Sequence, residues 1–101
     1  MEIYKFKLYV AGNTDLAQRA FVNLSNACQI LLYDRHTIEV IDILRDPRIA
    51  RENRIIATPM LVKYAPDPEV KIVGDLGDME TFALNLGLGY PKYEGDDGPS
   101  E

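Results

Sequence analysis

The chain has 101 residues, of which 47% are hydrophobic and 27% charged, as is typical of one globular domain. Its net charge of −5 argues against nonspecific nucleic-acid binding, and polar residues interrupt the longest uncharged stretch, 20–33, so we expect no membrane span. The single Cys28 cannot form an internal disulfide, which fits a cytoplasmic location, and the single His36 gives no metal-binding cluster. We therefore expect neither a metal nor another cofactor.

The charge is unevenly spread along the chain. In residues 91–101 one lysine stands against four acidic residues, and the stretch 94–101 has no apolar residue to bury. We expect residues 1–90 to form a single domain and residues 91–101 to be a disordered acidic tail.

The first half reads as strand, helix and strand. Residues 3–10 alternate, with Tyr4, Phe6, Leu8 and Val10 on one face, which predicts a strand. Thr14 suits the N-cap of a helix of about five turns, whose apolar stripe is formed by Leu16, Ala20, Leu24, Ala27 or Cys28, and Leu31. After a loop that contains His36, which we expect to be solvated, the β-branched run 37–44 predicts a strand covered on both faces.

The second half adds a short helix, two strands and a last helix. Asp46-Pro47 predicts an N-cap followed by a first-turn proline, in a helix 47–53 that turns Ile49 and Ala50 inward. Strands follow around Thr58-Pro59 and over 69–73. The last helix places Met79, Phe82, Ala83 and Leu86 on one face and contains Gly87 and Gly89, which weaken it.

This β-α-β-α-β-β-α order is that of the thioredoxin-like fold. The run Ala57-Thr58-Pro59-Met60 resembles the cis-proline loop of that fold, so Pro59 is a cis-proline candidate. In thioredoxins this loop faces two cysteines at the start of the first helix. Residues 11–16 contain no cysteine, so the fold is expected without its redox chemistry.

Other polar residues have structural interpretations. Cys28 lies on the apolar stripe, where a free cysteine usually acts as a small hydrophobe, rather than at a helix N-terminus that would activate it. Asp42, within an apolar strand, is either a buried, hydrogen-bonded carboxylate or a strand-edge residue, and has no second acid or base beside it. Arg45, Arg48, Arg51 and Arg54 form either a solvated helix face or a surface for an acidic protein partner.

Four runs, in order, resemble the KaiB family, over residues 3 to about 90. They are Lys7-Leu8-Tyr9-Val10-Ala11-Gly12-Asn13-Thr14, Val40-Ile41-Asp42-Ile43-Leu44, Ile56-Ala57-Thr58-Pro59 and Ile72-Val73-Gly74-Asp75-Leu76.

This resemblance implies a non-enzymatic regulator of the KaiC ATPase, whose phosphorylation and ATPase cycle it modulates in circadian or timing control. Members of the family are metamorphic: an oligomeric ground state, commonly a tetramer, has a differently folded C-terminal half. A rare thioredoxin-like monomer binds the first KaiC ring and then recruits KaiA and output histidine kinases. The locally inconsistent second half of this chain fits such a switch.

The resemblance also assigns residues. Arg19, Arg54 and Lys63 align with basic positions that contact KaiC, to which the neighbouring arginines of the short helix, Arg48 and Arg51, are added as partner-binding candidates. Fold-switch or oligomer roles fall to Asn85, Gly87, Gly89 and Tyr90. Glu39 stands where clock members usually have lysine, which bears on KaiA and kinase contacts.

Three function classes remain open. The first is the KaiB-type binding regulator, which includes a KaiB–KaiC pair used for stress adaptation without KaiA. The second is a thiol-dependent enzyme, against which the cysteine-free segment 11–16 argues. The third is the KaiB-like sensor module of a clock-output histidine kinase.

Overall fold

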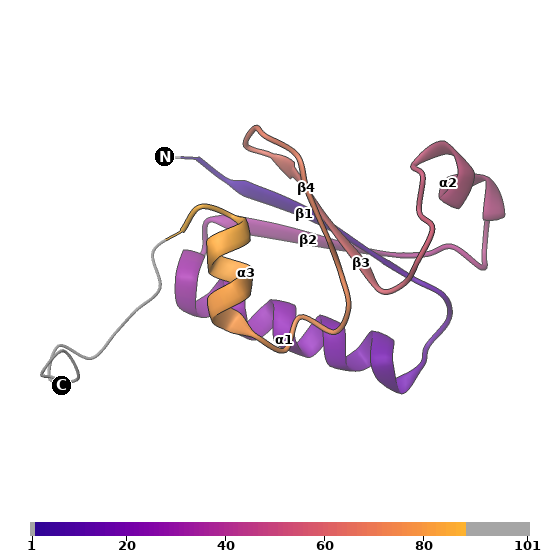
Figure 1. Ribbon diagram of the computed structural model, residues 1–101, viewed down its shortest axis with the longest axis horizontal. Coiled ribbons are helices and arrows are strands. Elements are labelled where there is room, and N and C mark those ends of the chain that lie inside the picture. The colour runs from indigo at the N-terminus through magenta and orange to yellow at the C-terminus, as the bar shows by residue number, and fades with distance from the viewer. Residues whose placement is uncertain (1, 89–101) are drawn as a thin grey trace, which may run out of the picture.

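The computed structural model describes residues 2–88 and confirms the predicted order of elements (Figure 1). The elements are β1 (Tyr4–Val10), α1 (Asp15–Leu32), β2 (His36–Asp42), α2 (Pro47–Glu52), β3 (Met60–Ala65), β4 (Val70–Val73) and α3 (Met79–Asn85). The predicted acidic tail, together with Gly89 and Tyr90, lies outside the described residues.

The strands form one four-stranded sheet in the order β2-β1-β3-β4. β1 runs parallel to β2 and antiparallel to β3, and β4 is antiparallel to β3. Helices α1 and α3 cover the same face of this sheet, whereas α2 lies at one end of the molecule, beyond the strands (Figure 1). This mixed sheet with a parallel β1-α1-β2 unit is thioredoxin-like.

The main core fills the space between the sheet and helices α1 and α3. Phe6 and Leu8 of β1 are fully buried there, as is Leu24 of α1. The ring of Phe6 lies 6.2 Å, centroid to centroid, from that of Phe82 on α3, so α3 is attached to the central strand directly. The predicted apolar face of β1 is therefore confirmed.

A second, smaller core covers the opposite face of β1 and β3. Tyr9, Met60 and Val62 are buried there, and Ile49 and Ala50 of α2 pack against them, as the sequence predicts. Asp46 caps α2 by accepting the backbone N–H of Arg48 at 3.1 Å, and Pro47 occupies the first turn. This cluster is what holds α2 to the rest of the chain.

The prediction that β2 is covered on both faces holds only in part. Ile38 packs against the main core and Ile41 against the second one. However, β2 pairs only with β1 at the edge of the sheet, none of its residues is fully buried, and Val40 is 48% exposed. His36 begins this strand rather than lying solvated in a loop, and its Nδ1 is buried without a hydrogen-bond partner. In α1 the buried stripe includes Ala17, while Leu16 is 42% exposed, because the helix faces the sheet from Ala17 onward.

Gly87 lies beyond α3, not within it as predicted. α3 ends at Asn85, Leu86 is its C-cap, and Gly87 has a left-handed φ of +72°. The N–H of Gly87 donates to the carbonyl of Leu84 at 3.1 Å, and the N–H of Leu88 to that of Ala83 at 2.8 Å. These two bonds form a Schellman motif, in which glycine terminates the helix and Leu88 packs on the main core.

Gly87→Ala should therefore lower stability rather than extend the helix. Because alanine is strained at a φ of +72°, we expect a loss of about 1 kcal/mol in the free energy of unfolding, measured with urea. Asn85→Ala is the control, since Asn85 is an exposed residue inside α3, where alanine is well tolerated. A stability gain at position 87 would contradict the cap.

Candidate functional site

The loop that follows β1 occupies the position of the thioredoxin active site. Thr14 caps α1 by accepting the N–H of Ala17 at 3.1 Å, as predicted. The Oδ1 atom of Asp42, at the end of β2, accepts the N–H of Gly12 and that of Leu44, each at 3.0 Å. This carboxylate therefore ties the loop to the neighbouring strand.

These bonds decide the role of Asp42. The backbone N–H of Gly12, then that of Leu44, lower the pKa of this carboxyl below its usual value. A carboxylate that is ionised and already accepts two backbone donors is poorly suited to act as a general base. Asp42 is both strand-edge and hydrogen-bonded, and its role is structural.

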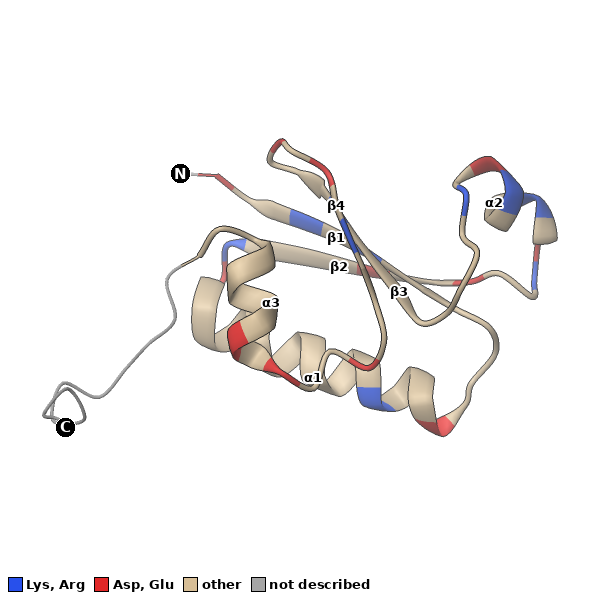
Figure 2. Cartoon of the chain, viewed as in Figure 1, with Lys and Arg blue, Asp and Glu red and all other residues tan. Residues whose placement is uncertain are grey.

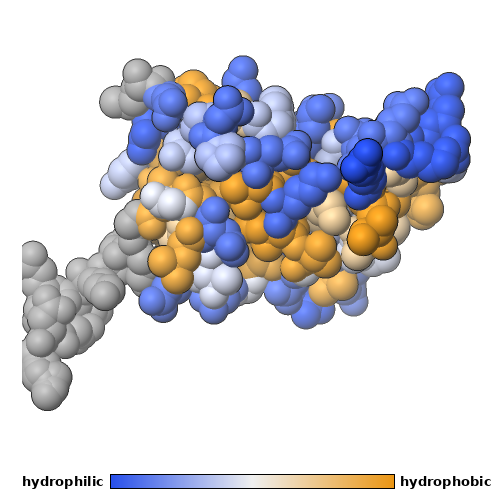
Figure 3. Space-filling model, turned by 45° about the horizontal axis from the view of Figure 1, so that its top comes forward, coloured by the Kyte–Doolittle hydropathy of each residue, from blue (hydrophilic) through white to orange (hydrophobic). Residues whose placement is uncertain are grey.

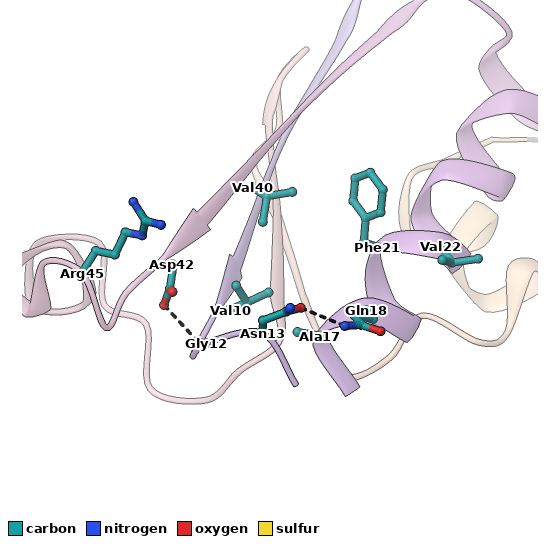
Figure 4. A pocket seen from close by; sticks show the side chains of 10 residues that line it. All are labelled: Val10, Gly12, Asn13, Ala17, Gln18, Phe21, Val22, Val40, Asp42 and Arg45. Carbon is teal, nitrogen blue, oxygen red and sulfur yellow. Dashed lines mark hydrogen bonds between the residues drawn. The ribbon is translucent and has the colours of Figure 1, made fainter. Parts of the chain in front are cut away.

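A hollow of about 660 Å³ opens between the β2 edge and α1 (Figure 4). Val40 of β2 and Phe21 of α1 line it from its two sides, and Phe21 is 44% exposed. At the loop end, the Nε2 of Gln18 donates to Oδ1 of Asn13 at 2.9 Å. Its walls are apolar and its loop end is polar, a combination that is typical of ligand-binding hollows.

No thiol reaches this loop. Cys28 is fully buried in the main core, and burial raises the pKa of its thiol to about 12. A thiol of that pKa is almost entirely protonated at neutral pH and is a poor nucleophile. Within residues 2–88, no group of three or more His, Cys, Asp or Glu side chains could hold a metal ion, and no helix could cross a membrane.

The Thr58–Pro59 peptide bond is cis. Pro59 is buried, and its carbonyl accepts the N–H of Gly74 at 3.0 Å, which ties this turn to the end of β4. Pro59 is not among the residues that line the hollow.

The arginines gather on and beside α2 (Figure 2). Because Ile49 and Ala50 face the second core, the remaining faces of this short helix point to solvent. All four arginines are exposed, and Arg48 forms a bidentate pair with Asp46, with its Nη2 2.9 Å from Oδ2. We call Arg45, Arg48, Arg51 and Arg54 the α2 arginine surface.

The other basic candidates lie elsewhere. The side chain of Arg19, on α1, is 60% exposed, with Nη1 3.9 Å from the carboxylate of Asp75. Lys63 is only 3% exposed, and its Nζ lies 5.6 Å from the centre of the Tyr4 ring. In this arrangement Lys63 cannot contribute its side chain to a partner surface, because that side chain is buried. Asn85 is exposed at the end of α3.

One long-range tether beside Arg19 was not predicted, because no local pattern indicates it. The Nδ2 of Asn23 donates to the backbone carbonyl of Asp75 at 2.7 Å, and Oδ1 of Asp75 accepts the N–H of Gly77 at 3.0 Å. Together with Arg19, these bonds attach α1 to the loop that leads into α3.

The geometry defines a thioredoxin-like domain without thiol chemistry and with a basic helix. A model of the KaiB domain matches residues 7–88, so the chain belongs to the KaiB family. It is 44% identical over 94 residues to the circadian clock oscillator protein KaiB of Nostoc punctiforme, covering 92% of this chain and 90% of that protein. The KaiB of Synechococcus elongatus is 40% identical over 94 residues, which cover 93% and 92% of the two chains.

Solved structures show the same fold. The N-terminal domain of Synechococcus elongatus SasA superimposes with a TM-score of 0.72 at 21% identity, covering 92% of this chain and 91% of that one. Mitochondrial thioredoxin 3 of Saccharomyces cerevisiae gives a TM-score of 0.65 at 17% identity, with 86% and 79% covered. The predicted thioredoxin-like fold is therefore confirmed, while the alternative ground-state fold of the C-terminal half stays a prediction.

Cys28 should be unreactive in the folded chain. Because its thiol is buried and its pKa is raised to about 12, we expect slow labelling by an aromatic disulfide reagent at neutral pH and fast labelling in urea. The pure protein should not reduce insulin disulfides. Insulin reduction that is lost in Cys28→Ala would overturn the non-redox interpretation.

Asn23→Ala should loosen the tether to the loop before α3. We expect a loss of about 1 kcal/mol in the free energy of unfolding, because the Asp75 carbonyl loses a part-buried donor. Asn26→Ala, which changes an exposed asparagine one turn away, is the control. Equal effects of the two variants would show that the tether is not stabilising.

Proposed function

We propose that this chain is a non-enzymatic regulator that binds a KaiC-type ATPase ring and modulates its phosphorylation and ATPase cycle in bacterial timing control. The observation that carries the proposal is the α2 arginine surface, exposed on a projecting helix of a KaiB-family chain whose thioredoxin loop has no thiol. The proposed location is the cytoplasm, with KaiA and output histidine kinases as further partners.

Charge supports this assignment of the surface. The whole chain is acidic, yet residues 45–54 hold four arginines against Asp46 and Glu52. A local positive surface on an acidic protein favours encounter with an acidic partner face and disfavours binding in other orientations. We place Arg19, Arg51 and Arg54 in the contact and leave the buried Lys63 out of it.

We also propose that the described arrangement is the binding-competent monomer, in exchange with an oligomer whose C-terminal half is folded differently. The Gly87 cap and the Asn23 tether both act on the segment that would refold. NMR secondary structure of residues 54–88 tests this proposal. One set of signals that matches β3, β4 and α3, in a monomer under all conditions, would contradict the switch.

A second candidate is a KaiB-like sensor module of a histidine kinase, which the TM-score of 0.72 to the SasA domain favours. A KaiB–KaiC stress-adaptation pair without KaiA is a variant of the main proposal. An adjacent gene for a double-domain ATPase would favour either KaiC-dependent role, and a kinase domain in the same gene would favour the sensor.

Truncating the exposed arginines should weaken binding to the KaiC-type ATPase. Arg19→Ala, Arg51→Ala and Arg54→Ala should each cost about 0.5–2 kcal/mol, measured by surface plasmon resonance. Higher salt should slow association, because screening removes the electrostatic steering.

Lys5→Ala is the matched control, since Lys5 is an exposed cation on β1, away from α2. If a triple arginine variant binds as tightly as the parent, the assignment of the contact to these arginines is wrong. A loss of binding in Lys5→Ala would then indicate a contact near the start of β1 instead.

A further inference from the structure

The hollow between β2 and α1 has exposed apolar side chains on both of its walls. Val40 is 48% exposed on β2, which within residues 2–88 has no strand beyond it. On the facing side of α1, Phe21 is 44% exposed and Val22 is 52% exposed. Single exposed apolar residues need no explanation. Three that line one hollow of about 660 Å³ form an apolar site of a size that suits a small molecule.

The loop end of the hollow is rich in hydrogen-bond donors. Asn13 and Gln18 lie to one side of Gly12, and Asp42 and Arg45 lie to the other (Figure 4). Because the Oδ1 of Asn13 accepts a bond from Gln18 at 2.9 Å, the Asn13 amide has its acceptor engaged and presents two N–H donors. Arg45 adds a guanidinium, which has five donors and no acceptor. A ligand group that offers several acceptors, such as a carboxylate, complements this end.

Arg45 is the charged lining residue that can pair with an anion. It is exposed, and within residues 2–88 no ion pair includes it. The carboxylate of Asp42 instead accepts the N–H groups of Gly12 and Leu44. These two bonds lower the pKa of Asp42 most and Arg45 lowers it least, so the guanidinium is not committed to this carboxylate. The other carboxylate of β2, on Glu39, lies on the opposite face of the strand from the hollow.

We propose that this hollow binds a small amphiphilic acid, with its apolar body between Phe21 and Val40 and its carboxylate at Arg45. Arg45 lies just before α2, and in the view of Figure 3 hydrophilic side chains cover the α2 end of the molecule. The acid group therefore stays at a hydrated end while the apolar body leaves water. All the lining residues fall within 10–45, so the site depends neither on the ATPase contact nor on the proposed refolding of residues 54–88.

The first test is an NMR titration of the isotope-labelled full chain at neutral pH and low salt, with octanoate as the probe. Octan-1-ol and octylammonium carry the same chain with a neutral or a positive head. We expect saturable amide shifts within residues 10–22 and 40–45 for octanoate, about tenfold weaker binding of octanol, and weaker binding still of octylammonium. Octanol that binds as tightly as octanoate, shifts scattered over the whole chain, or the absence of saturable binding overturns the proposal.

The second test uses paired variants to separate the charged end of the site from its apolar walls. Arg45→Gln should weaken octanoate binding about fivefold and leave octanol binding unchanged, because only the charge contact is lost. Arg35→Gln is its control, since Arg35 precedes β2 as Arg45 follows it. Phe21→Ala should weaken the binding of both ligands. Leu84→Ala, which shortens an exposed apolar side chain on α3, should weaken neither.

Two results of these variants contradict the site. Equal losses in Arg45→Gln and Arg35→Gln would show a general charge effect rather than a contact at the hollow. An unchanged affinity in Phe21→Ala would place the ligand elsewhere on the molecule. Circular dichroism verifies the fold of each variant.

Discussion

The burial of β1 on both of its faces is the constraint on which the rest of the structure depends. Its one face, through Phe6 and Leu8, holds α1 and α3 over the sheet. Its other face, through Tyr9, joins Met60 and Val62 to form the small core under α2. Because β1 also pairs with both β2 and β3, every other element is positioned by contact with this strand or its partners.

The central position of β1 also determines which side chains are exposed at each end of the sheet. Where β1 ends, Asp42 of β2 accepts the N–H of Gly12 and that of Leu44, so the loop in the position of the thioredoxin thiols is tied to β2 and lies beside the hollow. On α2, by contrast, only Ile49 and Ala50 face the second core, and the arginines are exposed to solvent. The fold thus joins a loop that contains no cysteine to a charged, projecting helix.

Local signals predicted much of this fold. The Thr14 and Asp46 caps and the alternation in β1 are short-range features, because each depends only on residues that are close together in the sequence. The edge position of β2 was not predictable in this way, because a β-branched run looks alike whether or not another strand lies beside it. The φ of Gly87 depends on where α3 ends, which is set by the packing of Leu88 on the core.

The candidate site was predicted less completely. The exposure of the arginines on and beside α2 could be predicted from the sequence. Ile49 and Ala50 are the only residues expected to face inward on this short helix, so its other faces are free for the arginines. The burial of Lys63 depends on its strand lying inside the sheet and on Tyr4 across it. The Asn23–Asp75 contact joins residues 52 apart in the sequence, and no local pattern indicates such a pairing.

The central proposal is that the α2 arginine surface, and not the loop 11–16, is the partner-binding surface of this KaiB-family chain. The most direct measurement is an NMR amide-shift map of the labelled chain titrated with a KaiC-type ATPase ring. The account predicts that the signals that shift or broaden first belong to residues 45–56, with those around Arg19. Perturbations confined to residues 11–16 and the β2 edge, with α2 unchanged, would contradict it.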